Sequence, residues 1–285
     1  MVDHTNTDTI RFVRIREVIE ETPTTRTFLF EDEHSTASKP GQFLMVWIPQ
    51  IEELPMSVGI ESFESGELAA VTVKKYGFGS TSLYQKQVGE YIGIRGPYGN
   101  HFSIPVSLRN ALLIGGGTGL VPLVRLFKDL LRHRVESSLI TGAKTKNEVL
   151  FENKVQKLLV HSNFIGNIAY STDDGSYGLK GSAVDLAESI LFSKEFDMIY
   201  TCGPELMMKG IHSLGEKFSI PVEASLERYM KCAIGICGSC CINDRLVCRD
   251  GTIFDSNGLR QLTEFGVRYR DKSGRFSYFP STGTK

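Results

Sequence analysis

The chain has 285 residues, of which 41% are hydrophobic and 23% charged, and its formal net charge is -1. A chain of this size and composition is long enough for two or more globular domains, and its near-neutral charge indicates neither nucleic-acid binding nor attraction to an anionic membrane surface. The sequence has no apolar run of the roughly 18 residues that a membrane-spanning helix needs, and residues 1–30 lack the apolar core of a signal peptide.

Residues 9–104 are predicted to form short β-strands separated by turns. One candidate helix interrupts them over residues 80–88, where a serine and a threonine can cap its start. Short strands without helical periodicity predict a small antiparallel β-barrel. Six strands are expected, at residues 10–15, 25–30, 42–48, 56–60, 68–74 and 91–95.

Two segments of this barrel have a composition suited to ligand binding. The turn at residues 77–81, Gly-Phe-Gly-Ser-Thr, can offer backbone amides and hydroxyls to a diphosphate, although such a turn is more often only a turn. Pro55-Met56-Ser57 begins a strand after an irregular loop over residues 49–54. An edge strand that starts at a proline explains these three residues equally well.

Residues 106–222 have the pattern of a nucleotide-binding fold. The apolar run at residues 110–114 predicts a buried parallel strand, which leads directly into Gly115-Gly-Gly-Thr-Gly119 and a helix over residues 120–133. Strand, glycine turn and helix form the phosphate-binding unit of dinucleotide folds, although the glycines match the Rossmann fingerprint only in part. Strands at 138–141, 168–170 and 198–201 alternate with helices at 147–161, 183–192 and 204–218, which predicts a doubly wound sheet.

Two loops at the ends of these strands are expected to line the ligand crevice. Residues 171–176 carry Asp173 and Asp174 directly after a strand, where an acid can hold a ribose 2'-hydroxyl and repel a 2'-phosphate. This favours NAD over NADP. Cys202 ends another strand in the sequence Cys-Gly-Pro, but it is equally well explained as a small buried residue.

Five of the six cysteines lie between residues 227 and 251. The spacing from Cys232 to Cys237, Cys240 and Cys248, with interleaved glycines, suits a [2Fe–2S] cluster of plant type. A structural zinc site is the alternative, but it usually has two Cys-x-x-Cys pairs and this chain has one. Cys241 competes for the third ligand position; the two-residue gap after Cys237 favours Cys240 and leaves Cys241 as a small buried residue. Clustered cysteines indicate metal ligation in a reducing compartment, so we expect a cytoplasmic protein.

Taken in order, these segments resemble the electron-transfer subunit of class 1B dihydroorotate dehydrogenase, within the ferredoxin reductase superfamily. The resemblance covers about residues 9–257 and is most specific in the cysteine loop and in the Asp-Asp-Gly-Ser segment. The matching segments are Pro55–Ser57, Gly77–Ser80, Arg95–Asn100, Gly115–Gly119, Asp173–Ser176, Cys202–Pro204 and the cysteine loop.

The resemblance implies a multidomain β plus α/β protein that contains FAD, a [2Fe–2S] cluster and NAD. It implies an FAD-binding β-barrel at residues 1–105, an NAD-binding α/β domain at 106–222, a cluster domain at 223–257 and a C-terminal tail at 258–285. Met56 and Ser57 would contact the flavin ring, and Lys74, Gly77, Gly79, Ser80 and Thr81 its ribityl and diphosphate part. Gly116, Gly117, Thr118, Asp173 and Cys202 would contact the nicotinamide nucleotide, and Cys232, Cys237, Cys240 and Cys248 would bind iron.

The implied function is an electron relay in pyrimidine biosynthesis, between NAD and the FMN of a dihydroorotate dehydrogenase catalytic subunit in a hetero-oligomer, with a heterotetramer as the expected form. FAD exchanges electron pairs with the nicotinamide and the cluster passes single electrons. No side chain of this chain need act on dihydroorotate. The alternatives are a reductase subunit of another complex, of sulfhydrogenase or ferredoxin:NADP reductase type, and a non-redox nucleotide-binding module with zinc.

Two features depart from the family pattern. Leu54 stands before Pro55 where the flavin-strand motif usually has arginine. Either flavin binding is weaker than in the family, or Lys74 or Lys75 supplies the positive charge. The segment from residue 256 to 285 extends past the usual end and is rich in arginine and aromatic residues. It is expected either to dock a partner or to pack over the chain's own surface.

Overall fold

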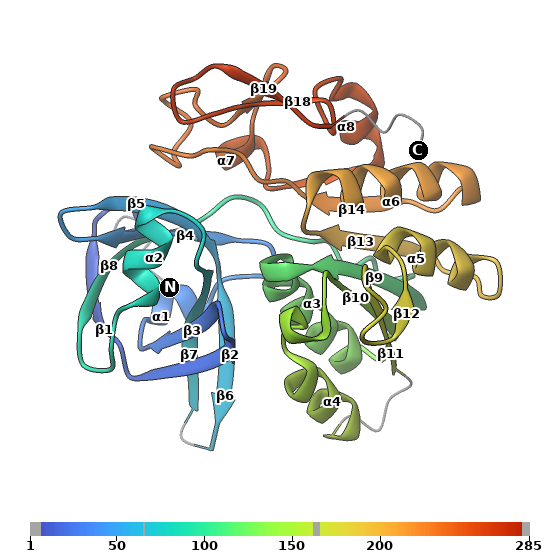
Figure 1. Cartoon of the computed structure of the whole chain (residues 1–285), viewed down its shortest axis with the longest axis horizontal. Coiled ribbons are helices and arrows are strands. Elements are labelled where there is room, and N and C mark those ends of the chain that lie inside the picture. The colour runs from blue at the N-terminus through green and yellow to red at the C-terminus, as the bar shows by residue number, and fades with distance from the viewer. Residues whose placement is uncertain (1–6, 65, 162–165, 281–285) are drawn as a thin grey trace.

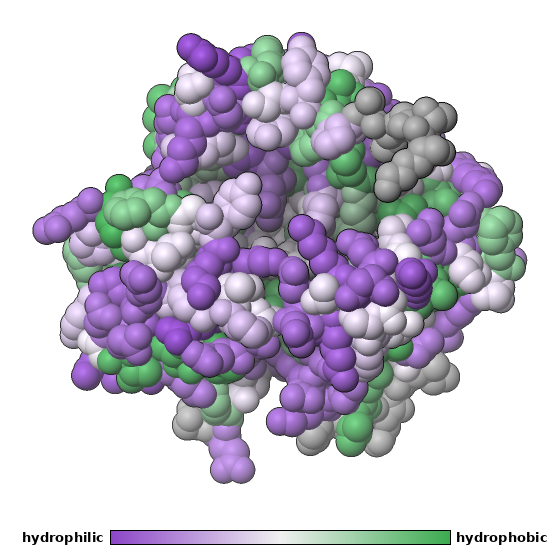
Figure 2. Space-filling view, in the orientation of Figure 1, coloured by the Kyte–Doolittle hydropathy of each residue, from purple (hydrophilic) through white to green (hydrophobic). Residues whose placement is uncertain are grey.

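The computed structural model describes residues 7–64, 66–161 and 166–280. Figure 1 shows a β-barrel, drawn in blue to cyan, beside an α/β domain that runs from green to orange, with the C-terminal segment in orange and red above both. The surface is hollowed where these three parts meet (Figure 2). No helix in the described ranges combines the length and the apolar character needed to cross a bilayer.

The barrel consists of two four-stranded antiparallel sheets, in the orders β1-β8-β4-β5 and β2-β3-β7-β6. Two short helices, α1 (Glu33–Thr36) and α2 (Phe78–Tyr84), accompany them. Apolar side chains such as Phe28, Leu44 and Ile94 are fully buried between the sheets. The strands are β1 (Arg11–Arg14), β2 (Glu17–Thr22), β3 (Thr25–Phe30), β4 (Phe43–Ile48), β5 (Glu52–Ser57), β6 (Gly59–Phe63), β7 (Gly66–Lys74) and β8 (Tyr91–Tyr98).

The barrel differs from the prediction in several places. β2 was not predicted, and α2 begins two residues before and ends four residues before the helix predicted at residues 80–88. The irregular loop predicted at residues 49–54 is wrong from Glu52 onward, because β5 begins there and pairs with β4 along its whole length. The single strand predicted at residues 56–60 is also wrong, since the chain changes sheet at Val58, between β5 and β6. Pro55 lies on an edge strand, where prolines in sheets are found because alternate backbone nitrogens face away from the sheet.

The α/β domain is built on a seven-stranded sheet in the order β12-β11-β10-β9-β13-β14-β17. All neighbouring pairs are parallel except β14 with β17. The bounds are β9 (Asn110–Gly116), β10 (Glu136–Ala143), β11 (Gly166–Thr172), β12 (Leu179–Lys180), β13 (Met198–Cys202), β14 (Val222–Ser225) and β17 (Ile253–Asp255). This is the predicted doubly wound arrangement, with its switch point between β9 and its neighbours β10 and β13.

Four helices and two short 3₁₀ turns complete this domain. Buried side chains of α3 and α4 belong to one apolar core, and those of α5 and α6 to another on the opposite face of the sheet. The bounds are α3 (Leu120–Arg132), α4 (Glu152–His161), α5 (Ala183–Leu191), α6 (Glu205–Phe218), η2 (Gly117–Gly119) and η3 (Lys146–Glu148). The helix predicted from residue 147 therefore begins five residues later, after η3 and an extended residue, Val149.

The C-terminal segment folds back on the α/β domain. The domain boundary predicted between residues 222 and 223 falls inside β14, and β17 adds a later piece of chain to the same sheet. Phe265, which lies in the predicted tail, is fully buried in the core that contains residues of α6. Between and after these strands lie β15 (Cys241–Ile242), β16 (Arg245–Leu246), α7 (Val247–Asp250), α8 (Ser256–Gln261), β18 (Arg268–Arg270) and β19 (Phe276–Tyr278). This segment therefore packs against the rest of the chain, and Lys272 extends the contact to the barrel through a 2.8 Å ion pair with Glu52 of β5.

Candidate functional site

A cleft of about 400 Å³ lies where the barrel, the α/β domain and the segment before the cysteine loop meet. Five of the predicted cofactor residues line it: Met56, Ser57, Lys74, Ser80 and Thr118. The other seven predicted cofactor residues do not line this cleft; they are Gly77, Gly79, Thr81, Gly116, Gly117, Asp173 and Cys202. Three parts of the chain far apart in sequence therefore contribute to one cavity.

The turn before α2 uses its own hydroxyl to hold its backbone amides. Ser80 Oγ accepts hydrogen bonds from the amides of Tyr76 at 3.0 Å and Gly77 at 2.9 Å. The Glu52 side chain lies against Gly79, so that a Cβ at position 79 would overlap the Glu52 carboxylate. A diphosphate at this turn would take over amides that now bond to Ser80.

Of the two lysines expected to replace the missing arginine, only Lys74 lines the cleft. The Lys74 ammonium forms a 2.6 Å ion pair with Glu148 of η3. Lys75 instead lies over the ring of Tyr84, 4.3 Å from its centroid. Leu54 is a partly buried residue packed against the barrel core. Lys74 is therefore the residue of this pair placed to meet an anionic ligand, and Glu148 offsets its charge.

The glycine turn after β9 and the Cys-Gly-Pro loop after β13 are packed directly together. The two strands are paired neighbours, with Cys202 opposite Gly115. A Cβ at Gly119 would overlap the backbone of Cys202, and Gly203 has a φ of +147°. Only glycine allows the backbones of the two loops to come this close. Their packing holds Thr118 at the rim of the cleft, and the glycine turn lies at the carboxyl ends of the strands.

The Asp-Asp-Gly-Ser segment forms a tight turn after β11. The Asp174 carboxylate accepts hydrogen bonds from the amide of Ser176 at 2.9 Å and from its hydroxyl at 2.6 Å. Ser176 Oγ in turn accepts from the amide of Lys146 at 2.8 Å. Asp173 is exposed at the same carboxyl edge of the sheet as the glycine turn. Its role toward a ribose hydroxyl stays a prediction.

A buried ion pair between Glu205 and Arg228 anchors the segment that leads into the cysteine loop. Their side chains are 8% and 2% exposed, respectively, and Arg228 Nη2 lies 2.9 Å from Glu205 Oε1. Glu205 also accepts a hydrogen bond from the amide of Gly266 at 2.8 Å. This pair was not predicted from the sequence. The features that could have indicated it are an acidic residue at the first helical position after Cys-Gly-Pro and an arginine just before the cysteines.

Glu227 is a second lining residue that sequence reasoning did not select. Glu227 is exposed to the cleft. Desolvation by the surrounding protein nevertheless raises the pKa of its carboxyl group, and repulsion by Glu205 raises it further. Burial and the charge of Glu227 raise the pKa of the Cys202 thiol, which lies beneath the cleft. Cys202 is thus a neutral buried thiol at physiological pH, which agrees with its interpretation as a small buried residue.

Three of the predicted iron ligands, Cys232, Cys237 and Cys240, lie on one loop, and the fourth, Cys248, lies in α7. Hydrogen bonds from backbone amides to sulfur link the four in two pairs. Cys232 Sγ accepts hydrogen bonds from the amides of Ile236 and Cys237, at 3.4 Å each, and Cys240 Sγ accepts from the amide of Cys248 at 3.5 Å. The tight path of the loop uses positive φ angles at residues 233, 235 and 238, two of them glycines. Backbone amides directed at sulfur favour thiolate ligands.

The two pairs differ in exposure and acidity. Burial opposes ionisation of Cys237, but hydrogen bonds with Ser239 and Cys232 lower the pKa of its thiol to about 6. Burial and the proximity of Cys240 raise the pKa of the Cys248 thiol to about 12. Cys241 is partly buried, and its thiol donates to the carbonyl of Asn243 at 2.8 Å. This hydrogen bond is consistent with Cys240, and not Cys241, as the third iron ligand, which stays a prediction.

Four thiols in two pairs are the donor set of a [2Fe–2S] cluster, in which each of two irons takes two protein ligands. Within the described ranges, no group of three or more His, Cys, Asp or Glu side chains is arranged to hold a metal ion. The four thiols fit the predicted cluster by the number and type of their donors, and their assignment as iron ligands stays a prediction.

Two family models match the chain. Residues 227–260 match the iron-sulfur cluster binding domain of dihydroorotate dehydrogenase B, and residues 113–213 match the oxidoreductase NAD-binding domain. The chain is 38% identical over 268 residues to a Methanocaldococcus jannaschii protein named probable dihydroorotate dehydrogenase B (NAD(+)), electron transfer subunit, with 93% of this chain and 97% of that protein covered. A Methanocella arvoryzae protein of the same name is 40% identical over 265 residues, with 92% and 96% covered.

The chain belongs to the family of dihydroorotate dehydrogenase B electron transfer subunits. Among solved structures, that of the NADH-dependent reduced ferredoxin-NADP oxidoreductase aligns with a TM-score of 0.76 and 26% identity, covering 89% of this chain and 92% of that one. The cytochrome b5 reductase domain of Ulva prolifera nitrate reductase shares the fold, with a TM-score of 0.62, 22% identity and coverage of 75% and 95%. The predicted family and fold class are confirmed.

Family membership makes the chain an oxidoreductase subunit for electron transfer, with FAD, NAD and an iron–sulfur cluster as its cofactors. The cofactor prediction is confirmed at this level. The residue assignments within the site stay predictions, and the cleft described above is where the predicted flavin residues and the cysteine segment come together.

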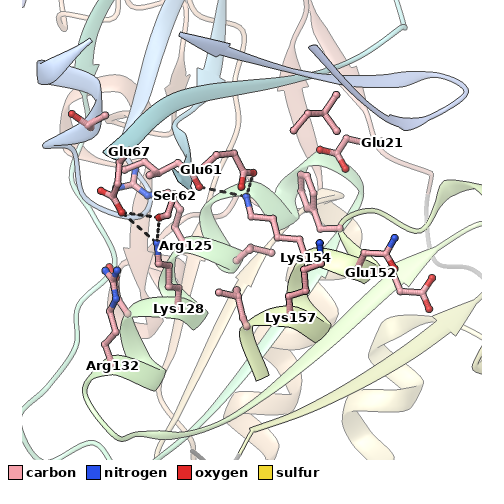
Figure 3. A pocket seen from close by; sticks show the side chains of 18 of the residues that line it. Glu21, Glu61, Ser62, Glu67, Arg125, Lys128, Arg132, Glu152, Lys154 and Lys157 are labelled. Atoms are coloured by element: carbon pink, nitrogen blue, oxygen red, sulfur yellow. Dashed lines mark hydrogen bonds and ion pairs between the residues drawn. The ribbon is translucent and has the colours of Figure 1, made fainter. Parts of the chain in front are cut away.

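A larger cleft, of about 830 Å³, lies elsewhere, between the barrel and helices α3 and α4. Charged side chains of both signs line it, and several pair across it (Figure 3). Lys154 forms an ion pair with Glu61, and Lys128 Nζ lies 2.6 Å from Ser62 Oγ and 3.4 Å from Glu67 Oε1. None of the predicted site residues lines this cleft. Its balanced charges mark a joint between domains and do not favour one ligand.

Proposed function

We propose that this chain relays electrons between NAD and the FMN of a dihydroorotate dehydrogenase catalytic subunit, through its FAD and a [2Fe–2S] cluster. One observation carries the proposal. Residues 225–228 and Met230, which lie just before Cys232, line the same cleft as Met56 and Ser57 of β5. The cysteine loop and the predicted flavin strand are therefore neighbours, as a relay between the two cofactors requires.

The cleft residues would bind and orient FAD. Met56 and Ser57 would contact its ring from the edge strand β5, while Lys74 and Ser80 would meet its anionic part. FAD, when bound, exchanges electron pairs with a nicotinamide and single electrons with a one-electron carrier. Gly116, Gly117 and Thr118 would hold the nicotinamide nucleotide at the β9 switch point, and Asp173 would select NAD over NADP.

Cys232, Cys237, Cys240 and Cys248 would be the iron ligands. The amides of residues 236, 237 and 248 already point at sulfur and would stabilise the negative charge of a thiolate-bound cluster. All six cysteines are free of disulfides, which is the state that a cytoplasmic location would maintain. Substrate oxidation would take place on the partner subunit, in a hetero-oligomer, which we expect to be a heterotetramer.

Cofactor analysis of protein purified without oxygen tests this proposal. We expect two irons, two acid-labile sulfides and one FAD per chain, a visible spectrum with both flavin and cluster bands, and bleaching by NADH. Addition of a dihydroorotate dehydrogenase catalytic subunit with FMN should allow dihydroorotate to reduce NAD. A colourless protein with one zinc and no iron or sulfide would contradict the proposal and favour the nucleotide-binding zinc module.

A reductase subunit of ferredoxin:NADP type is the second candidate. The 26% identity and the TM-score of 0.76 to the ferredoxin-NADP oxidoreductase structure favour it over a sulfhydrogenase-type subunit and over the zinc module. The cofactors would be similar and only the partner would differ. Reduction of ferredoxin by NADPH or NADH in a purified native complex, without any reaction of dihydroorotate, would decide for this candidate.

A further inference from the structure

Arg95 joins the predicted flavin strand to the cysteine loop. It lies on β8, and its Nε and Nη2 donate hydrogen bonds of 2.8 and 2.7 Å to the two carboxylate oxygens of Glu53. Glu53 lies on β5, three residues before Met56. On its other side the guanidinium donates to the carbonyl oxygen of Cys232, from Nη1 at 3.4 Å and Nη2 at 3.5 Å. One side chain thus contacts both the strand and the first cysteine of the loop.

The surroundings hold this guanidinium in place and keep it charged. The Arg95 and Glu53 side chains are only 13% and 21% exposed. Arg95 Nη1 also donates to the Tyr98 hydroxyl at 3.1 Å, and burial raises the pKa of that hydroxyl to about 12, so it stays neutral. The planar fork of arginine matches a carboxylate in a way that lysine cannot. Two bonds to Glu53 fix its plane, and the remaining donors face Cys232 and Tyr98.

We propose that Arg95 is a positioning residue that fixes the Cys232 end of the cysteine loop against β5 and whose charge, balanced by Glu53, sets the reduction potential of the cluster. This inference rests on the proposed function, because it requires a cluster on the loop. The two residues of this ion pair are 42 residues apart in sequence. Neither is among the predicted flavin contacts or iron ligands.

The two charges of the pair should act on the potential in opposite directions. Reduction adds one negative charge to a cluster, so a nearby cation favours the reduced form and a nearby anion opposes it. Arg95→Met removes the cation and should lower the potential. Glu53→Gln keeps the cation and removes its balancing anion, so it should raise the potential. Damage to packing alone predicts no such opposition of sign.

The experiment compares four variants by potentiometric titration of the as-purified holoprotein, following the flavin optically and the cluster by electron paramagnetic resonance. The variants are Arg95→Met, Arg95→Lys, Glu53→Gln and, as a control, Lys194→Met. Lys194 forms a half-exposed ion pair with Glu136 in the α/β domain, so the control also removes one positive charge from an ion pair. Iron, sulfide and FAD are counted in each sample.

We expect Arg95→Met to lower and Glu53→Gln to raise the cluster potential, each by about tenfold in the reduction equilibrium, which is ~59 mV for a one-electron couple. The FAD content should be unchanged in both, and the control should match the parent protein. Arg95→Lys should keep the cluster potential closer to the parent value than Arg95→Met does, because lysine retains the positive charge. It should lose iron faster on dilution than the parent protein, because lysine lacks the planar guanidinium that holds Glu53 and Cys232. Iron loss confined to Arg95 variants, with FAD retained, also supports the positioning role.

Unchanged potentials in both Arg95→Met and Glu53→Gln, with full iron content, would overturn the inference. Shifts of the same sign in the two variants would overturn its electrostatic part. A parent protein without iron would instead contradict the proposed function, so the two failures are distinguishable.

Discussion

At the scale of single residues, neighbouring cysteines have different surroundings and should have different roles. Cys237 is exposed, has a lowered thiol pKa and lies beside Cys232, whereas Cys241 donates its thiol hydrogen to the Asn243 carbonyl. Cys237→Ser should abolish the cluster while much of the FAD stays bound. Cys241→Ser should retain the iron. Iron and sulfide per FAD measure the difference, and equal iron in the two variants would refute the assignment.

The buried Glu205–Arg228 ion pair should contribute more to the stability of the fold than an exposed ion pair does. Glu205→Gln would leave the buried Arg228 charge without its carboxylate and should lower the free energy of unfolding by about 3–5 kcal/mol. The exposed pair Arg16–Glu31 is the control, since Glu31→Gln should cost no more than ~1 kcal/mol. Urea denaturation measures both. Equal losses would show that Glu205 acts through something other than this pair.

At the scale of elements, the sequence predicts the helices and strands whose hydrophobic pattern is contained within the element itself. α3 and β9 were predicted to within two residues, because one-sided burial of a helix and full burial of a strand leave direct periodic signals. The cysteine loop was found by spacing alone. β2 was missed and β5 was misplaced, because Glu17–Thr22 and Glu52–Ser57 are rich in acids, and their strand state comes from pairing with β3 and β4.

Contacts between distant segments could not be predicted from patterns either. Arg95 with Glu53 and Glu205 with Arg228 are 42 and 23 residues apart, and nothing in the local sequence signals their pairing. The lining residue Glu227 was likewise not selected, although it lies five residues before the first cluster cysteine. The site was therefore predictable where chemistry requires fixed spacing, as in the cysteine and glycine loops, and unpredictable where the fold alone brings charges together.

The contact between α6 and the C-terminal segment gives a prediction for pH. His212 of α6 is buried near Phe265, with their rings 6.5 Å apart, and burial lowers its pKa. The folded protein thus prefers neutral histidine, while the unfolded chain binds a proton below a pKa of about 6.5. The stability that His212 supports is present above this pH and is lost as the pH falls.

His212→Gln should accordingly remove part of the loss of stability between about pH 7 and pH 5. Urea midpoints across this range measure it, and the comparison with the parent protein isolates His212 from other groups that titrate there. The parent curve should fall more steeply toward acid than that of the variant. Parallel curves would show that His212 titrates alike in the folded and unfolded chain.

At the scale of the whole molecule, the three parts are joined by different kinds of contact. One apolar core contains Phe43, Met45 and Tyr98 of the barrel together with residues of the α/β domain and of the cysteine segment. The joint between the barrel and helices α3 and α4 is instead polar, with Lys154–Glu61 and Lys128–Glu67 as its ion pairs (Figure 3). Salt screens such charges when they are partly exposed, so the polar joint is the one that ionic strength should loosen.

A double-mutant cycle across this joint tests the consequence for electron transfer. The cycle compares Lys154→Met, Glu61→Gln and the double variant. Because the ion pair fixes the nucleotide domain relative to the barrel, we expect a coupling energy of up to ~1 kcal/mol at low salt. This coupling corresponds to about fivefold in the rate at which NADH reduces the FAD. The coupling should disappear at about 1 M salt, where charges are screened within ~3 Å. Cluster content should stay at the parent level, since the joint lies away from the cysteine loop. Stopped-flow absorbance of the flavin measures the rate, and a coupling that persists in high salt would mean that packing, and not charge, orients the two domains.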